Sequence, residues 1–154
     1  MSDFFQFEAD FTDSLRCIPM TVRYKLDSCG VKLKLHQWNR FSTAERQQLV
    51  DSACDSPAER ATYRSQLIGL IQGQGETPSE LPVDPQPAWL DSAQIPAEVQ
   101  EQAASVGQAL SLDQWVGLSP LQRFALIKLS RSQHENSNFL PALREFNLVP
   151  DPAQ

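Results

Sequence analysis

The sequence predicts an all-α protein in which two helical halves, related by an internal pseudo-twofold axis, form a single domain over residues 1–154. Three observations support this prediction: a long internal repeat, apolar residues at helical spacing, and helix-capping patterns in both copies. When the sequence is shifted by 77 positions, residues 18–50 align with residues 95–127 without a gap. The identical pairs include Ile18/Ile95, Pro19/Pro96, Val22/Val99, Gly30/Gly107, Leu33/Leu110, Leu35/Leu112, Gln37/Gln114, Trp38/Trp115, Ser42/Ser119, Arg46/Arg123 and Leu49/Leu126.

The full repeats are expected to cover residues 11–71 and 89–147. With one residue of slack, the match extends upstream to Phe11-x-Asp13-Ser14 and Trp89-x-Asp91-Ser92. Residues 73–88 lie between the repeats and are rich in proline and glycine. Such a composition predicts a linker that is partly in polyproline form.

The first helix of each repeat is predicted to begin at Ile18-Pro19 and at Ile95-Pro96, because proline suits the first helical position. Gly30 and Gly107 then provide left-handed stops. The apolar stripes of these two helices follow a four- and three-residue spacing. They consist of Val22, Leu26 and Cys29 in the first copy, and Val99, Ala103 and Val106 in the second.

The next element carries the shared tryptophan, and its form is ambiguous in the first copy. Residues 31–36 alternate like a strand, whereas Ser111 and Gln114 of the second copy form a capping box that predicts a short helix. Since paired copies should share a backbone, a short helix is expected in both. Trp38 and Trp115 are expected in the core or at the twofold interface, and the shared Arg46/Arg123 pair is expected to be structural.

Two further helices are predicted in each half. Capping boxes at Ser42-x-x-Glu45 and Ser119-x-x-Gln122 open the first of them. Ser56 caps the last helix of the first copy, which reaches about Ile71, and Asn138 starts the last helix of the second. The side chains expected to face inward are Leu49, Val50, Tyr63, Leu67, Leu70, Leu126, Ile127, Phe139, Leu143 and Phe146.

The composition narrows the class of protein. A net charge of −6 argues against general nucleic-acid binding. No apolar run approaches the roughly 18 residues of a membrane span, and the acidic start lacks the pattern of a secretory signal, so a cytoplasmic protein is expected. The three cysteines, Cys17, Cys29 and Cys54, form no C-x-x-C pair, which disfavours a zinc knuckle, an iron–sulfur cluster and a disulfide framework.

Charge is segregated along the chain, which predicts either an interaction surface or two regions that neutralise each other across the fold. Seven basic residues lie between Arg16 and Arg46, whereas the interval between Arg64 and Arg123 contains only acidic charges. Most of the basic set is absent from the second copy, where uncharged or acidic residues stand at the same positions. Positions peculiar to one copy are candidates for function. The candidate partner- or cofactor-binding residues are Arg16, Cys17, Arg23, Lys25, Lys32, Lys34 and His36.

No pattern of catalytic residues emerges. The two histidines, His36 and His134, are far apart and have no motif around them, and no glycine-rich phosphate loop occurs. We therefore expect neither enzymatic activity nor a metal site.

Two segments, Phe5-Gln6-Phe7-Glu8-x-Asp10-Phe11 and the stretch from Leu15-Arg16-Cys17-Ile18-Pro19-Met20 to Trp38, resemble the nitrate reductase-associated protein family. The resemblance covers essentially the whole chain and is most distinctive over residues 4–46. Members of that family occur mainly in cyanobacteria, and their genes tend to lie near those for nitrate reductase and molybdopterin synthesis.

The resemblance implies an accessory protein that is required for active nitrate reductase. We expect a maturation factor, or chaperone, for the molybdenum-containing, ferredoxin-dependent enzyme. It would bind the apo-enzyme, or bind its molybdopterin dinucleotide cofactor transiently, or both. Molybdenum-cofactor biosynthesis proteins are further possible partners. The alternative is a regulatory or structural subunit that docks on the mature enzyme through the basic segment.

Overall fold

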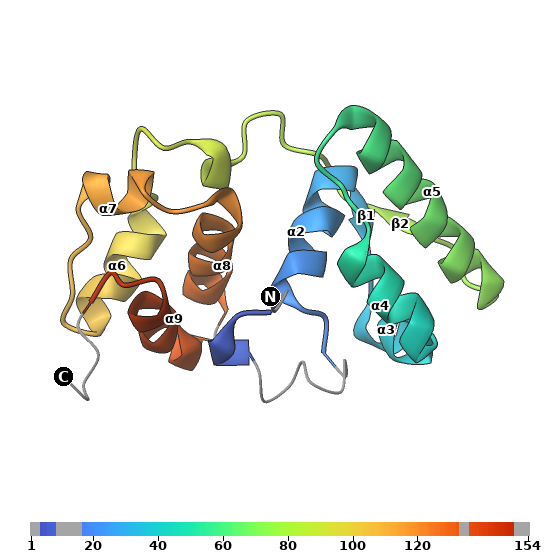
Figure 1. The fold of residues 1–154 in the computed structure, drawn as a ribbon, viewed down its shortest axis with the longest axis horizontal. Coiled ribbons are helices and arrows are strands. Elements are labelled where there is room, and N and C mark those ends of the chain that lie inside the picture. The colour runs from blue at the N-terminus through green and yellow to red at the C-terminus, as the bar shows by residue number, and fades with distance from the viewer. Residues whose placement is uncertain (1–3, 9–16, 133–135, 150–154) are drawn as a thin grey trace. The chain divides into compact units, whose positions relative to one another are not determined.

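The structure is a computed structural model that describes residues 4–8, 17–132 and 136–149 (Figure 1). Within these residues the chain forms eight α-helices, three short 3-10 helices and one two-stranded sheet, so the predicted mainly helical class is confirmed. The chain divides into two compact units. Unit 1 comprises Glu8–Asp84 together with Phe4, and unit 2 comprises Pro85–Gln154 together with Phe5–Phe7. The division falls inside the predicted linker.

Unit 1 contains four α-helices and the small sheet. The helices are α2 (Met20–Cys29), α3 (Leu35–Arg40), α4 (Thr43–Asp51) and α5 (Pro57–Gly73). The strands β1 (Val31–Lys32) and β2 (Ser79–Glu80) pair antiparallel, with Val31 opposite Glu80 and Lys32 opposite Ser79. The short 3-10 helix η1 (Gln6–Glu8) precedes these elements.

The core of unit 1 forms where α2 packs against α4 and α5. Trp38, Leu49 and Leu67 are fully buried there. The Tyr63 hydroxyl donates a hydrogen bond to the Leu49 carbonyl over 2.8 Å, which satisfies the polar end of a ring that is 1% exposed. The expected inward face of α5 is confirmed at Tyr63 and Leu67. The third inward residue is Ile71, which is fully buried, and not the expected Leu70, which is only partly buried.

Unit 2 contains the 3-10 helices η2 (Ala88–Leu90) and η3 (Asn136–Asn138) and four α-helices. These are α6 (Ala97–Ser105), α7 (Leu112–Val116), α8 (Pro120–Arg131) and α9 (Phe139–Glu145). Helix α8 lies at the centre and contacts α6, α9 and η2. Trp115 and Phe124 are fully buried, and the rings of Phe5 and Phe7 pack on Phe146.

The predicted helix caps form as the sequence indicates. Ser42, Ser56, Ser111 and Ser119 each accept the backbone N–H three residues on, and the glutamate or glutamine at that position bonds back. Gly30 and Gly107 both have φ of 75°, a left-handed conformation in which glycine avoids the strain of a Cβ atom.

The start of α2 differs from the prediction by one residue. Pro19 and Pro96 stand at the N-caps, and the helices begin at Met20 and Ala97. Proline has no side-chain acceptor for the first free N–H groups. In unit 1 the carboxylate of Glu8, which is 1% exposed, accepts the N–H of Met20 over 3.2 Å. A negative group at a helix N-terminus is favourable, so Glu8 takes the place of a conventional cap.

Residues 31–36 are partly strand and partly helix. Val31 and Lys32 form β1 because β2 supplies a partner, and the helical turn of α3 begins at Leu35. The partner strand comes from the segment that was expected to be linker. Leu81 N–H also donates to the Gly30 carbonyl over 2.9 Å. Part of residues 73–88 is therefore packed on unit 1 instead of forming a free connector.

The two units share their order of helices and several local features. The tryptophan of the short helix is 0% exposed in both, which confirms its predicted core position. Arg123 is 7% exposed and donates to the carbonyls of Trp89 and Trp115, as expected of a structural residue. Whether the two units superpose as a duplicated fold stays a prediction. None of the described helices is long and apolar enough to span a bilayer.

Candidate partner-binding surface

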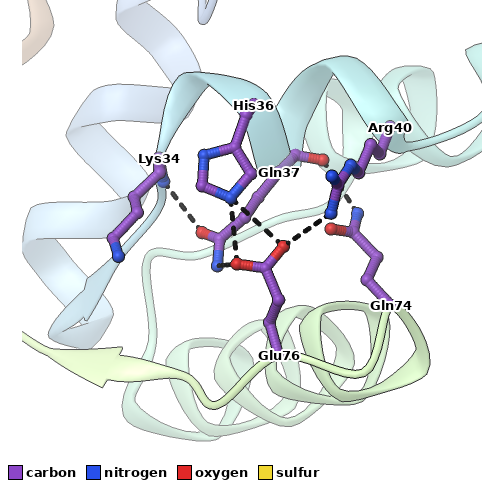
Figure 2. A network of polar contacts seen from close by, with 6 residues as sticks. All are labelled: Lys34, His36, Gln37, Arg40, Gln74 and Glu76. Carbon is purple, nitrogen blue, oxygen red and sulfur yellow. Dashed lines mark hydrogen bonds and ion pairs between the residues drawn. The ribbon is translucent and has the colours of Figure 1, made fainter.

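The centre of the candidate surface is the carboxylate of Glu76, which three side chains of α3 contact (Figure 2). His36 Nε2 lies 2.9 Å and 3.1 Å from its two oxygens. Arg40 donates to Oε2 over 3.0 Å, and Gln37 Nε2 donates to Oε1 over 3.2 Å. These bonds favour the charged form of the carboxyl group. The hydrogen bond from His36 is the largest cause that lowers the pKa of Glu76, and the positive charge of Arg40 adds to it.

The end of α5 brings Glu76 to this position. Gly75 has φ of 78° and reverses the chain after the helix, and Glu76 N–H then returns to the Ile71 carbonyl. Gln74 Nε2 donates to the Gln37 carbonyl over 2.9 Å and fixes the turn against α3. The network therefore joins α3 to residues that follow it by 36 to 40 positions.

Gln37 positions the start of α3. It is 3% exposed, and its Oε1 accepts the backbone N–H of Lys34 over 2.9 Å. Lys34 has no side-chain acceptor, so this helix start has only the glutamine half of a capping box. With Trp38 buried on the same side, the rest of the helix faces outward.

Unit 2 contains a similar arrangement around Gln114, but the group that this glutamine contacts is a backbone carbonyl and not a carboxylate. Gln114 Oε1 accepts from Ser111 N–H, and its Nε2 donates to the Leu148 carbonyl over 3.0 Å. Leu148 follows Asn147, whose φ of 62° matches the left-handed turn at Gly75. A bridging glutamine is therefore part of the common frame. The positions of His36 and Arg40 hold Asp113 and Gly117 in unit 2, so neither basic side chain has a counterpart there.

Four basic side chains, those of Lys32, Lys34, His36 and Arg40, lie on the outside of this region. Lys32 and Lys34 are exposed, and they alternate with the buried Val31 and Leu33, so both extend from the same side of the chain. The side chains of His36 and Arg40 are 50% and 61% exposed, while that of Glu76 is 25% exposed. Leu35, in the middle of the group, is 51% exposed.

Two other predicted site residues have bonds within unit 1. Lys25 Nζ donates to the carbonyls of Val50 and Ser52 over 2.6 Å and 2.7 Å, and lies 5.7 Å from the centre of the Tyr63 ring. Arg23 Nε donates to the Ile18 carbonyl over 2.9 Å. Their charged groups thus stabilise the fold of unit 1.

Arg16 and Cys17 are the remaining predicted site residues. Cys17 is half-buried with a free thiol, and Arg16 lies outside the described residues. Cys29 and Cys54 are buried. Burial raises the pKa of both thiols, that of Cys54 to about 11, so they stay protonated near neutral pH. Across the part of the chain that the structure describes, no three His, Cys, Asp or Glu side chains converge as metal ligands do.

The structure thus brings Lys34 and His36 into one network with three residues that were not predicted as site residues: Gln37, Arg40 and Glu76. One sequence signal pointed to Gln37, since it aligns with the capping Gln114. Glu76 had no such signal, because its counterpart Leu148 is 72 positions away rather than 77. A shift of 77 positions therefore does not align Glu76 with Leu148.

These features define a small, mostly helical protein that presents cations on one face of its first unit. Over residues 4–146 the chain matches the family of conserved nitrate reductase-associated proteins, and it belongs to that family. The family name suggests an accessory role beside nitrate reductase. No curated protein and no solved structure matches the chain.

Proposed function

We propose that this protein is a non-enzymatic maturation factor for molybdenum-containing, ferredoxin-dependent nitrate reductase, acting in the cytoplasm. It binds the apo-enzyme, the molybdopterin dinucleotide cofactor, or both, and molybdenum-cofactor biosynthesis proteins are further partners. Family membership supports the link to nitrate reductase. The observation that carries the binding role is the set of exposed cations in unit 1 that unit 2 lacks.

The exposed cations suit either ligand. The ammonium groups of Lys32 and Lys34 can hold phosphate oxygens of the cofactor by charge-assisted hydrogen bonds. They can equally meet carboxylates on the apo-enzyme, where complementary charge accelerates encounter. In this proposal a duplicated helical frame provides rigidity, and only its first copy has acquired the binding residues.

A retention experiment tests the proposal. The purified protein is immobilised and mixed separately with apo-nitrate reductase and with the extracted cofactor at low salt. Retention of one or both is expected, and its loss at high salt would agree with contacts between charges. Failure to retain either would contradict the proposed function.

The second candidate is a subunit that docks on the mature enzyme. The half-exposed Leu35 among the basic side chains fits this candidate as well as binding of the apo-enzyme, because an apolar side chain suits a protein surface better than a small phosphate ligand. The two functions differ in the stage at which nitrate reductase needs the protein. A maturation factor becomes dispensable once the reductase is loaded, whereas a subunit co-purifies stoichiometrically with the active enzyme.

A further inference from the structure

The exposed side chains of α3 form one continuous arc with a mixed chemical character. Successive residues of an α-helix are rotated by about 100°. Leu35, Asn39, His36 and Arg40 therefore fall, in that order, within an arc of about 140°, and all four are exposed. Lys32 and Lys34 lie directly before the helix. We use the name α3 face for the side chains of Lys32, Lys34, Leu35, His36 and Arg40.

The α3 face is electropositive and held in place. It carries three permanent cations, Lys32, Lys34 and Arg40, and of these Arg40 forms an ion pair with the carboxylate of Glu76. Glu76 contacts both His36 and Arg40 and so fixes their orientation. Arg40 uses one N–H for this ion pair, while a guanidinium group carries five. Because its side chain is 61% exposed, Arg40 can bind a second carboxylate from solvent.

The face also bears an apolar contact point. Leu35 is 51% exposed and is flanked by Lys34 and His36. A free phosphate or pyrophosphate group would leave this leucine uncovered. A protein segment with acidic residues around an apolar side chain would satisfy both the cations and Leu35.

The chain itself provides an example of an acidic segment in this region. Residues 76–81 run beside the basic residues, with Glu76 on His36 and Arg40 and with β2 paired to β1. Glu80, four residues on, forms an ion pair with Arg64. The basic part of unit 1 therefore already accepts an extended acidic stretch on one of its sides.

From these observations we propose that the α3 face binds an acidic protein segment of nitrate reductase. Carboxylates of that segment approach Lys32, Lys34 and the outer donors of Arg40, and an apolar side chain covers Leu35. This inference rests on the proposed function and names its partner as a protein segment instead of the phosphates of the cofactor.

Unit 2 offers a matched control for the apolar contact. Leu112 occupies the position of Leu35 in the repeat, at the first turn of α7, and is 47% exposed. Its neighbour is Asp113 where Leu35 has His36. A substitution at Leu112 removes an equally exposed leucine without touching the α3 face.

The test measures the dissociation constant of the full-length protein for purified apo-nitrate reductase at physiological salt, by biolayer interferometry. Leu35→Ala is expected to weaken binding about tenfold, because part of a leucine contact is lost. Leu112→Ala is expected to leave it unchanged. The double variant Lys32→Gln, Lys34→Gln is also expected to weaken binding about tenfold, mainly through slower association.

A second control separates local charge from net charge. Gln48→Glu with Ala58→Glu changes the net charge by the same −2 at exposed sites on α4 and α5, and wild-type affinity is expected. Circular dichroism and thermal unfolding establish that each variant is folded. Inorganic pyrophosphate serves as the competitor that represents a phosphate ligand.

The outcomes distinguish the two proposals. If the Leu35 and lysine variants bind with wild-type affinity, the α3 face is not the binding surface. That result overturns the inference but leaves the proposed accessory function in place. Competition by pyrophosphate together with normal binding by Leu35→Ala assigns the lysines to phosphates and also overturns the inference. If the wild-type protein does not bind the apo-enzyme, both the inference and the proposed binding of the apo-enzyme are wrong.

Discussion

Substitution of Lys25 tests whether some basic residues of unit 1 stabilise the fold while others are exposed for binding. Its ammonium group donates to the carbonyls of Val50 and Ser52, at the C-terminal end of α4, from a position on α2. It also lies near the face of the Tyr63 ring. Lys25→Met keeps the aliphatic part of the side chain but removes every one of these polar contacts. We expect a folded but clearly less stable protein.

The structure allows the magnitude to be worked out. A hydrogen bond from a charged donor contributes about 1.5–3 kcal/mol to stability, and an exposed cation–π contact adds about 0.5–1 kcal/mol. Water can partly replace the lysine at the end of α4, so we expect a loss of about 2–4 kcal/mol in the free energy of unfolding. With a slope of about 2 kcal/mol/M, the urea midpoint then falls by about 1–2 M.

The assay is urea unfolding followed by circular dichroism at the helix band. Lys32→Met is the matched control, since it removes the same group from an exposed site and should change stability by no more than about 0.5 kcal/mol. If Lys25→Met were as stable as the control, the structural assignment of Lys25 would be wrong, and Lys25 would return to the candidate binding residues.

Three further predictions concern glycine, pH and the thiols. Gly30 and Gly107 both have φ of 75°, a conformation that costs about 1–2 kcal/mol when alanine replaces the glycine. At Gly30 the new Cβ would also lie 2.7 Å from Val83 Cγ2 and 3.0 Å from the Leu81 carbonyl oxygen, whereas nothing lies within 4 Å at Gly107. Gly30→Ala should therefore be about 1 kcal/mol more destabilising in chemical denaturation, and equal losses would contradict the packing of residues 81–83 on Gly30. The lowered pKa of Glu76 means that its stabilising contribution is fully present above the ordinary pKa of a glutamate side chain and disappears as the pH falls through the lower pKa of the folded state. Unfolding free energies of wild type and Glu76→Gln should thus converge in acid, and a constant difference across this range would exclude the ion pairs as its cause. Thiol labelling at neutral pH should modify Cys17 in the folded protein and reach Cys29 and Cys54 only after unfolding, because both are buried and their pKa values are raised. Rapid labelling of Cys54 in the native state would refute this assignment.

The local features of the fold could be predicted because they depend on neighbouring residues. Ser42 with Glu45 forms a helix start within three positions, and Gly30 ends α2 by its own conformational freedom. The buried tryptophans followed from the repeat. These features need no knowledge of what lies elsewhere in the chain.

The candidate site could be predicted only in part because it depends on distant contacts. Lys25 and Lys32 look alike in the sequence, but the end of α4 lies beside the first and solvent beside the second. Glu76 was assigned to an acidic interval, and only the turn at Gly75 brings it to His36 and Arg40. The short strand β1 likewise required β2, whose residues had the composition of a linker.

The central claim is that the exposed cations of unit 1 bind a negatively charged partner needed for nitrate reductase activity. The most direct measurement is nitrate reductase activity in cells that lack the native protein and produce Lys32→Glu, Lys34→Glu in its place. Both positions are exposed, so we expect the purified variant to unfold at the wild-type temperature while activity in the cells is lost. Wild-type activity in cells producing this folded variant would contradict the claim.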